Sequence, residues 1–247
     1  MNPIYRQNFS VDDLVVDCFG NLKLSALLYY AQEAAGNHSA LLGVDHDFLA
    51  AHGLFWAVTR HRVQITRLPK RGETITVETW PMPTTKIAYP RSMAAHDTDG
   101  NELFRAISLW VLMDMNNRTM VLPGKSGITV TGSIQGKELA VPHAVIPKST
   151  TYEQNRLVTY SCLDRNGHMN NTRYLDWVDD LLPSRFHADH NPQEIIICYH
   201  AEAMEGQAIT LAWDLSEDGC LQVDARREKT DVSGGKERVF SAQVLFV

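Results

Sequence analysis

The sequence predicts an α+β protein made of two similar units, each with one long helix and an antiparallel sheet. Two observations indicate this duplication. Residues 17–21 (Asp-Cys-Phe-Gly-Asn) match residues 164–168 (Asp-Arg-Asn-Gly-His), and residues 72–77 match residues 206–211. In each half of the chain, a segment with helical periodicity is followed by segments with strand-like alternation.

The first unit, residues 1–130, is expected to begin with a long helix. Apolar side chains recur at helical spacing from Leu24, and Gly43 marks the expected end because glycine is favoured just beyond a helix C-terminus. Strands are expected at Thr74–Trp80, which alternates, and at Ala106–Met113, which is apolar on both faces.

Residues 131–150 are expected to form a connector, because glycines and prolines interrupt every periodic pattern there. The second unit, residues 151–247, repeats the plan. A short strand at 156–162 precedes a helix through residues 174–182, which Pro183 ends or kinks. Further strands are expected at residues 195–199, 209–216, 221–226 and 240–246.

The composition is that of a globular protein and excludes several classes of function. The chain has 247 residues, 44% hydrophobic and 21% charged, with a formal net charge of −6. A disordered chain and a general nucleic-acid binder are therefore not expected. No apolar run reaches the roughly 18 residues of a membrane span, and no secretory signal is visible. Four scattered cysteines without metal-ligand or redox spacing indicate reduced thiols in a cytoplasmic protein.

One segment departs from this acidic balance. Residues 60–71 carry five Lys or Arg residues and no acid. Such a segment can steer an acidic partner through its local field. The alternative is a solvated strand and turn, which the charge pattern alone favours.

The two copies differ in the polar residues ahead of their helices. Both have an aspartate, but the second copy has Asn166 and His168 where the first has a phenyl ring and an amide. A turn ahead of a helix presents free N–H groups that suit the oxyanion of a reaction at a carbonyl. Glu202 follows an apolar strand and is a candidate to activate water. The alternative is an ordinary Asx turn and helix cap, which the pattern alone favours.

Residues 163–177 (LDRNGHMNNTRYLDW) closely resemble the second-repeat signature of acyl–acyl carrier protein (acyl-ACP) thioesterases. Residues 32–38, 56–60 and 72–80 resemble the family's first repeat, and the likeness covers about residues 4–247 in order. The resemblance implies a tandem hotdog fold, with two long helices each wrapped by an antiparallel sheet. It also implies hydrolysis of the thioester between a fatty acyl chain and acyl carrier protein. Without a visible transit peptide, the chain resembles a bacterial member.

Carried over residue by residue, the resemblance implies a catalytic group of Asp164, Asn166, His168 and Glu202 in the second unit. Either Glu202 or Asp164 would act as general base on water, and His168 would orient that water or relay its proton. Asn166 and backbone N–H groups would hold the thioester carbonyl. A cysteine commonly follows the glutamate in plant members, but Ala203 stands there in this chain, so no cysteine role transfers.

The resemblance also implies where the substrate binds. We expect an apolar acyl tunnel in the first unit, with Trp56 among its lining residues. Because acyl carrier protein is acidic, we expect it to dock, with its phosphopantetheine arm, at Arg60, Arg67, Lys70 and Arg71. No metal or cofactor is expected, and a homodimer is left open.

Two other functions need to be distinguished from this one. A hotdog acyl-CoA thioesterase would use the same chemistry with a different handle on the acyl group. A non-catalytic acyl-binding module would not need the four polar residues of the second unit. A serine hydrolase is not expected, since no G-x-S-x-G occurs, and Gly124-Lys125-Ser126 lacks the first glycine of a phosphate loop.

Overall fold

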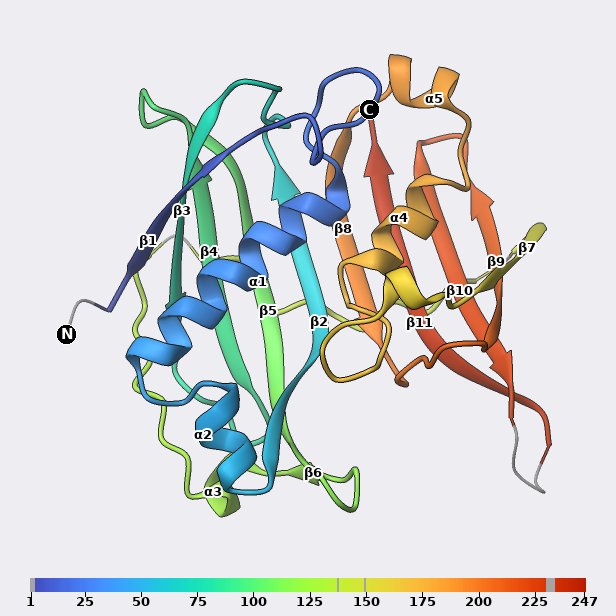
Figure 1. The fold of residues 1–247 in the computed structure, drawn as a ribbon. Helices are drawn as coiled ribbons and strands as arrows, with labels where there is room; N and C mark the ends of the chain where they lie inside the picture. The colour runs from blue at the N-terminus through green and yellow to red at the C-terminus, as the bar shows by residue number, and fades with distance from the viewer. Residues whose placement is uncertain (1–2, 137, 149, 230–233) are drawn as a thin grey trace. The chain divides into compact units, whose positions relative to one another are not determined.

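The computed structural model describes residues 3–136, 138–148, 150–229 and 234–247. The chain divides into two compact units, residues 1–142 and 143–247. Each unit contains an antiparallel sheet with helix against it, so the protein is α+β (Figure 1). Within the described ranges, no helix combines the length and apolar character that crossing a membrane requires.

The first unit is a five-stranded sheet in the order β1-β3-β4-β5-β2, with β6 paired to β5. All of these pairs are antiparallel. The elements are β1 (Tyr5–Ser10), α1 (Leu24–Leu41), α2 (His46–Ala51), β2 (Leu54–Ile65), β3 (Thr74–Pro81), β4 (Tyr89–His96), β5 (Glu102–Asp114), β6 (Met120–Val121) and α3 (Pro123–Ser126).

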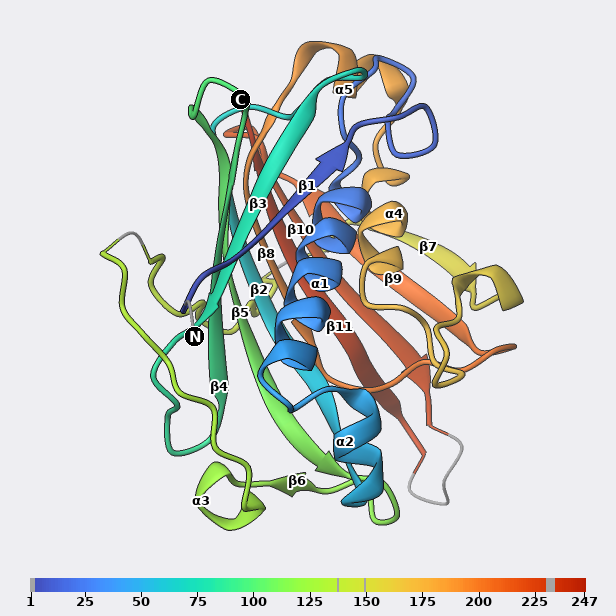
Figure 2. The same ribbon diagram turned by 60° about the vertical axis from the view of Figure 1, so that its left-hand side comes forward.

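Helix α1 lies across the sheet of the first unit, as predicted (Figure 2). Leu27 and Ala34 are completely buried between the helix and the sheet, and burial of a leucine side chain contributes about 1.5–3 kcal/mol. Tyr30 stacks on Phe9 with ring centroids 4.3 Å apart. The helix ends where expected, because Gly43 has a φ of 69°, which favours glycine.

The helix-facing side of this sheet also holds a buried polar cluster. Arg91 Nη1 lies 3.2 Å from Nδ1 of His38 on α1 and donates to Thr79 Oγ1 at 3.3 Å. Strand register places Arg91 beside Ser108, and Ser108 beside His61. All five residues are more than nine-tenths buried. A polar row therefore crosses the core beneath α1.

The second unit is a five-stranded antiparallel sheet in the order β8-β11-β10-β9-β7. Its elements are β7 (Tyr152–Leu157), a 3₁₀ turn (Tyr160–Cys162), α4 (Arg173–Asp179), α5 (Ser184–Asp189), β8 (Pro192–Tyr199), β9 (Ala208–Leu215), β10 (Cys220–Glu228) and β11 (Lys236–Phe246). Helix α4 lies against this sheet (Figure 1), with Tyr174 packed edge-on to Phe240 at 4.8 Å.

Two predictions for the second unit are wrong. The expected long helix is replaced by α4 and α5, of seven and six residues. Asn170 Oδ1 accepts from Thr172 N and Oγ1, which keeps the preceding residues in a turn, and Pro183 has no N–H to continue the helix. The strand expected at 156–162 ends at Leu157, because Tyr160–Cys162 forms the 3₁₀ turn.

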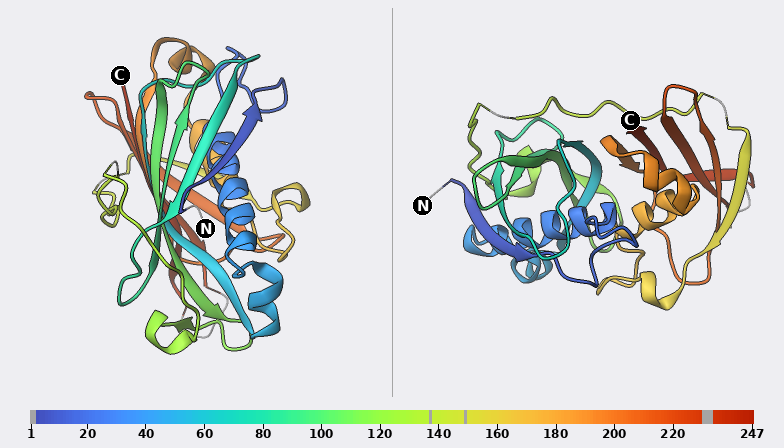
Figure 3. Two further views of the ribbon diagram at one scale, coloured as in Figure 1. Left: turned by 90° about the vertical axis from the view of Figure 1, so that its left-hand side faces the viewer. Right: turned by 90° about the horizontal axis from the view of Figure 1, so that it is seen from above.

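In the described part of the chain, residues 127–151 contain no helix or strand. Residues 127–136 and 138–142 nevertheless pack against the first unit, on the face of the sheet opposite α1 (Figure 3). Ser133 N donates to Pro81 O at 2.9 Å, and Trp80 Nε1 donates to Glu138 Oε1 at 3.2 Å. This cover leaves Trp80 only 2% exposed. The segment is therefore a strap on the sheet and not a loose linker.

Candidate active site

The residues expected to be catalytic in the second unit begin with an Asx turn built by Asp164. Its Oδ1 accepts from Asn166 N at 2.8 Å and from His168 N at 3.4 Å. Gly167 has a φ of 78°, a conformation that favours glycine, and Asp164 N donates to His168 O at 2.8 Å. The carboxylate of Asp164 is therefore engaged in holding the turn that presents Asn166 and His168.

His168 and Glu202 are brought together from segments 34 residues apart. His168 Nδ1 lies 3.5 Å from Glu202 Oε1. The His168 side chain is 11% exposed and that of Glu202 is 43% exposed. Glu202 lies in the loop after β8 and not on a strand. The main chain of His168 is held beside this loop, because His168 pairs with Met204 in a β-bridge and Met169 N donates to Ala203 O at 2.8 Å.

Two tyrosines, the buried Tyr174 and the partly buried Tyr199, support this turn. Tyr199 donates through its hydroxyl to Asn171 O at 2.9 Å, and its ring lies 5.5 Å from that of Tyr174. Burial raises the pKa of Tyr174 above its usual value; the charge of Arg227 opposes this rise, and the carboxylates of Asp164 and Glu202 add to it. Both phenols therefore stay neutral near pH 7 and serve as rigid packing beside the site.

The first unit contains the same turn without the same chemistry. Asp17 Oδ1 accepts from Phe19 N and Asn21 N, both at 2.9 Å, and Gly20 has a φ of 79°. Leu22 N donates to Pro69 O at 2.8 Å, just as Met169 N donates to Ala203 O. This register puts Leu68 in the place of Glu202. The first unit thus lacks both groups: Asn21 stands in place of the imidazole of His168, and Leu68 stands in place of the carboxylate of Glu202.

Most of the residues expected to dock a carrier are engaged within the first unit. Arg67 Nη1 lies 2.9 Å from Glu73 Oε2 and Arg67 Nη2 lies 3.6 Å from Asp97 Oδ2. Arg71 pairs with Asp13, and Arg60 Nη1 donates to Pro142 O at 3.1 Å. Lys70 is exposed and, within the described ranges, forms no ion pair.

Trp56, the residue expected to line an acyl tunnel, lies in a packed cluster. Its indole Nε1 donates to Val44 O at 2.9 Å, and its ring meets Tyr89 edge-on at 4.9 Å. The cluster also includes the buried Leu49, Leu54 and Leu112. The position of Trp56 is thus fixed by core packing.

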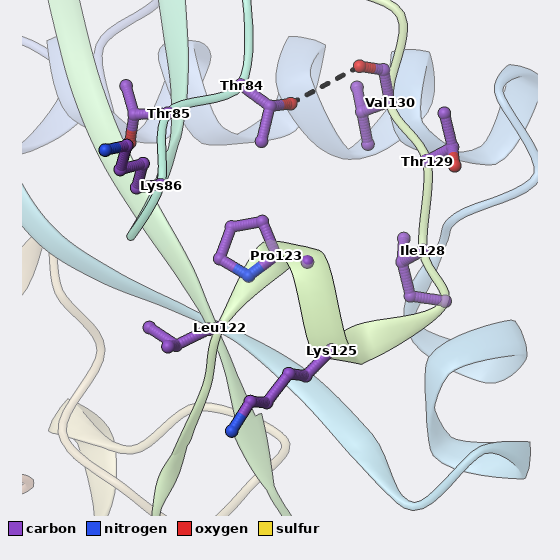
Figure 4. Close-up of a pocket in the computed structure, with 10 residues that line it drawn as sticks. Thr84, Thr85, Lys86, Leu122, Pro123, Lys125, Ile128, Thr129 and Val130 are labelled. Carbon is purple, nitrogen blue, oxygen red and sulfur yellow. Dashed lines mark hydrogen bonds between the residues drawn. The ribbon is translucent and has the colours of Figure 1, made fainter.

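A pocket of about 700 Å³ opens elsewhere in the first unit, between residues 84–86 and 122–130 (Figure 4). Lys86 and Lys125 extend on the side opposite Ile128 and Val130 in that view. The segment Gly124–Ser126 belongs to α3, a four-residue helix. None of Asp164, Asn166, His168 and Glu202 lines this pocket.

Sequence reasoning missed one residue of the site's surroundings, Arg227 of β10. Its Nη1 donates to the backbone oxygen of Glu202 at 2.6 Å. The sequence offers no local signal for this contact, because it joins residues 25 positions apart through strand register. Among the described residues, no three His, Cys, Asp or Glu side chains are grouped in a way that would hold a metal ion.

Comparisons with known proteins match this description along both units. The family model for the acyl-ACP thioesterase N-terminal domain matches residues 2–122, and the model for the C-terminal domain matches residues 147–239. A palmitoyl-ACP thioesterase of Cuphea hookeriana is 25% identical over 198 residues, covering 73% of this chain and 47% of the relative. A dodecanoyl-ACP hydrolase of Cinnamomum camphora is 25% identical over 214 residues, covering 81% and 56%. The chain thus spans about half the length of these curated relatives.

Solved structures share the fold over the whole chain. An acyl-ACP thioesterase from Bacteroides thetaiotaomicron superposes with a TM-score of 0.87 at 23% identity, covering 100% of this chain and 98% of that one. The 12:0-ACP thioesterase from Umbellularia californica gives a TM-score of 0.83 at 21% identity, with the same coverage. Because both domain models of one family match the chain in order, the chain belongs to the acyl-ACP thioesterase family.

Proposed function

We propose that this protein hydrolyses the thioester that joins a fatty acyl group to acyl carrier protein, releasing a free fatty acid. The contact between His168 Nδ1 and Glu202 Oε1, beside the Asp164 turn, is the observation that carries the proposal. The names of the relatives agree with it, since they specify palmitoyl-ACP thioesterase and dodecanoyl-ACP hydrolase activities.

Glu202 is the better candidate for the general base, and Asp164 for the residue that positions the turn. Asp164 Oδ1 already accepts two backbone N–H groups, whereas Glu202 is partly exposed and meets the His168 ring. His168 relays the proton: its Nε2 accepts a proton from an attacking water molecule while its Nδ1 proton passes to the carboxylate of Glu202, which thus acts as the base through the imidazole. The water oxygen bonds to the carbonyl carbon, and the C–S bond then breaks to release a thiolate.

The developing oxyanion needs hydrogen-bond donors. Asn166 is exposed at the turn, and its side-chain Nδ2 donates to Asp164 Oδ2 at 3.5 Å. We assign Asn166 and neighbouring backbone N–H groups to the thioester oxygen. A thiol with a pKa of about 8.5 leaves readily as the thiolate, so protonation of the leaving group is a lesser requirement.

The division of labour within the chain follows from the unequal turns. We assign a tandem hotdog arrangement, with residues 1–130 as the acyl-binding repeat, 131–150 as the connector and 151–247 as the catalytic repeat. Each unit has a helix on an antiparallel sheet and the same Asx turn, but only the second has His168 and Glu202. For the docked carrier, the candidate contact is Lys70, which is exposed and forms no ion pair within the described ranges.

Release of free thiol from acyl-ACP, by wild type and by His168→Ala, tests this function. We expect wild type to release thiol and fatty acid, and the variant to lose about 100-fold or more in turnover while its circular dichroism is unchanged. Near-normal turnover by the variant would contradict the assignment. Retention of the acyl-ACP by wild type without thiol release would instead indicate a binding module, and a preference for acyl-CoA would change the substrate.

A further inference from the structure

One arginine of β10 makes several bonds to the loop that carries Glu202. Arg227 Nη1 donates to the backbone oxygen of Glu202 and to Gln207 Oε1, both at 2.6 Å. Its Nε and Nη2 donate to Glu237 Oε2 at 2.9 and 2.6 Å. The Arg227 side chain is only 17% exposed. One guanidinium thus ties the loop, through Glu202 and Gln207, to the strands β10 and β11, a geometry that the planar fork of arginine suits.

The hydrogen bonds of Arg227 connect it, through Gln207 and Met204, to the main chain of His168. Gln207 Oε1, which accepts from Arg227, also accepts from Met204 N at 3.0 Å. Met204 pairs with His168 in a β-bridge, and the intervening Ala203 is bonded to Met169. Residues 202–204 are therefore fixed at both ends, and the carboxylate of Glu202 projects from a main chain whose position Arg227 sets.

The equivalent loop of the first unit is held by an ion pair with the charges exchanged: the arginine lies in the loop, and the acid stands where the second unit has Arg227. Thr76 pairs with His96, and Thr210 pairs with Arg226, so the next residues, Asp97 and Arg227, occupy equivalent positions. Glu73 likewise stands where Gln207 stands in the second unit. There the cation is Arg67 of the loop itself, which pairs with Glu73 and Asp97. Arg67 Nη1 also donates to the backbone oxygen of Leu68 at 3.4 Å. Both clamps therefore reach the main chain at this position, but only in the second unit does the residue so held carry a carboxylate.

We propose that Arg227 is a positioning residue for the reaction, which sets the distance between Glu202 and His168 by holding the Glu202 main chain. The assignment rests on the proposed thioester hydrolysis. Misplacement of a reacting group by about 1 Å can cost about 100-fold in rate. Loss of the clamp therefore lowers kcat and leaves the acyl and carrier contacts, and with them KM, largely unchanged.

The test compares Arg227→Gln and Arg227→Lys with a matched control, Arg238→Gln. Arg238 donates to both oxygens of Asp224, at 2.7 and 2.9 Å, from the adjacent strand β11. Among the described residues, its side chain forms no hydrogen bond to the loop at 200–207. Asp97→Asn provides a second control, because it weakens the equivalent clamp in the first unit. Thiol release from acyl-ACP is measured below the melting temperature of every variant.

We expect Arg227→Gln to lower kcat about 10- to 100-fold with KM within about twofold of wild type. Arg227→Lys recovers part of kcat, since one ammonium reaches a single acceptor but does not form the fork. Arg238→Gln and Asp97→Asn lower the melting temperature without lowering kcat. If Arg227→Gln does not fold, Arg227→Lys decides: a lowered kcat at unchanged KM supports the assignment.

The assignment is overturned if Arg227→Lys keeps the wild-type kcat, or if Arg227→Gln matches Arg238→Gln in kcat and loses only stability. Both results would leave the proposed hydrolysis intact. A wild-type protein that releases no thiol from acyl-ACP would instead overturn the proposed function itself.

Discussion

Asp17 and Asp164 occupy equivalent positions in the two units, and only Asp164 lies beside the proposed catalytic residues. Each carboxylate accepts two backbone N–H groups of its own turn, and each turn closes on a glycine with positive φ. The aspartate is therefore required by the turn whether or not a reaction follows. What distinguishes the second unit is the imidazole of His168 and the carboxylate of Glu202, which meet at 3.5 Å.

Because only the second unit has the pair of His168 and Glu202, substitutions of the two equivalent aspartates should have different outcomes. Asp17→Ala and Asp164→Ala each remove two hydrogen bonds to a carboxylate, so we expect similar losses of about 1–3 kcal/mol in the free energy of unfolding. Only Asp164→Ala displaces Asn166 and His168, and we expect its kcat to fall about 100-fold. Urea unfolding and thiol release measure the two effects. A similar loss of kcat in Asp17→Ala would show that the turns do not act separately.

The exposed Lys70 of the basic segment (residues 60–71) predicts that charge reversal selectively raises the KM for the carrier-bound substrate. Because Lys70 is exposed and forms no ion pair within the described ranges, Lys70→Glu reverses a charge without breaking the fold. We expect the KM for acyl-ACP to rise about threefold to tenfold, with no change for a small acyl thioester. Lys125→Glu, another exposed lysine of the first unit, is the control. Equal changes for both substrates would contradict docking at Lys70.

The candidate site was predictable where it is local and unpredictable where it is not. Asp164, Asn166 and His168 lie in one short turn whose glycine and aspartate are visible in the sequence. Arg227 joins the loop of Glu202 through strand register, and the partners of Arg67 and Arg71 include Asp97 and Asp13. A count of charges along residues 60–71 therefore overstated the free positive charge, because distant acids compensate it.

At the scale of elements, prediction succeeded where the apolar period was uninterrupted. Helix α1 and the strands β3, β5, β9, β10 and β11 lie where their patterns indicated. The second helix is shorter because residues 164–172 serve the turn of the site instead of extending α4. Strand β7 is mostly polar, so its bounds carried little hydrophobic signal.

The strap formed by residues 127–136 and 138–142 depends on a close approach that only glycine permits. A Cβ atom at Gly132 would overlap the backbone of Met82 and Pro83. We expect Gly132→Ala to reduce the free energy of unfolding by about 1–3 kcal/mol. The matched control is Gly36→Ala in α1, where a Cβ meets nothing within 4 Å, and where we expect a gain of about 0.5–1 kcal/mol. Urea midpoints that fall equally for both would contradict this role for Gly132.

At the scale of the whole molecule, the buried polar row makes folding sensitive to acid. Burial lowers the pKa of His38 to about 4, with the Arg91 charge adding to this effect, and burial lowers the pKa of His61 to about 4. The ordinary value is 6.5, so the unfolded chain takes up these protons first as the pH falls. The stability is fully present above pH 6.5 and is lost as the pH falls toward 4.

Between pH 7 and pH 5, we expect each of these histidines to remove about 2 kcal/mol from the free energy of unfolding. His38→Gln keeps an acceptor for Arg91 Nη1 but does not titrate. Its loss between the two pH values is therefore about 2 kcal/mol smaller than that of wild type. Urea unfolding at both pH values measures the difference, and identical losses in the two proteins would exclude His38 as a source.

The central claim is that His168 and Glu202 act as one unit in the hydrolysis of acyl-ACP. The most direct measurement is kcat for thiol release by His168→Ala, Glu202→Gln and the double variant. We expect each single substitution to lower kcat about 100- to 10,000-fold, and the double variant to be within about threefold of the more damaged single one. Losses that multiply in the double variant would show that the two side chains act independently and would contradict the claim.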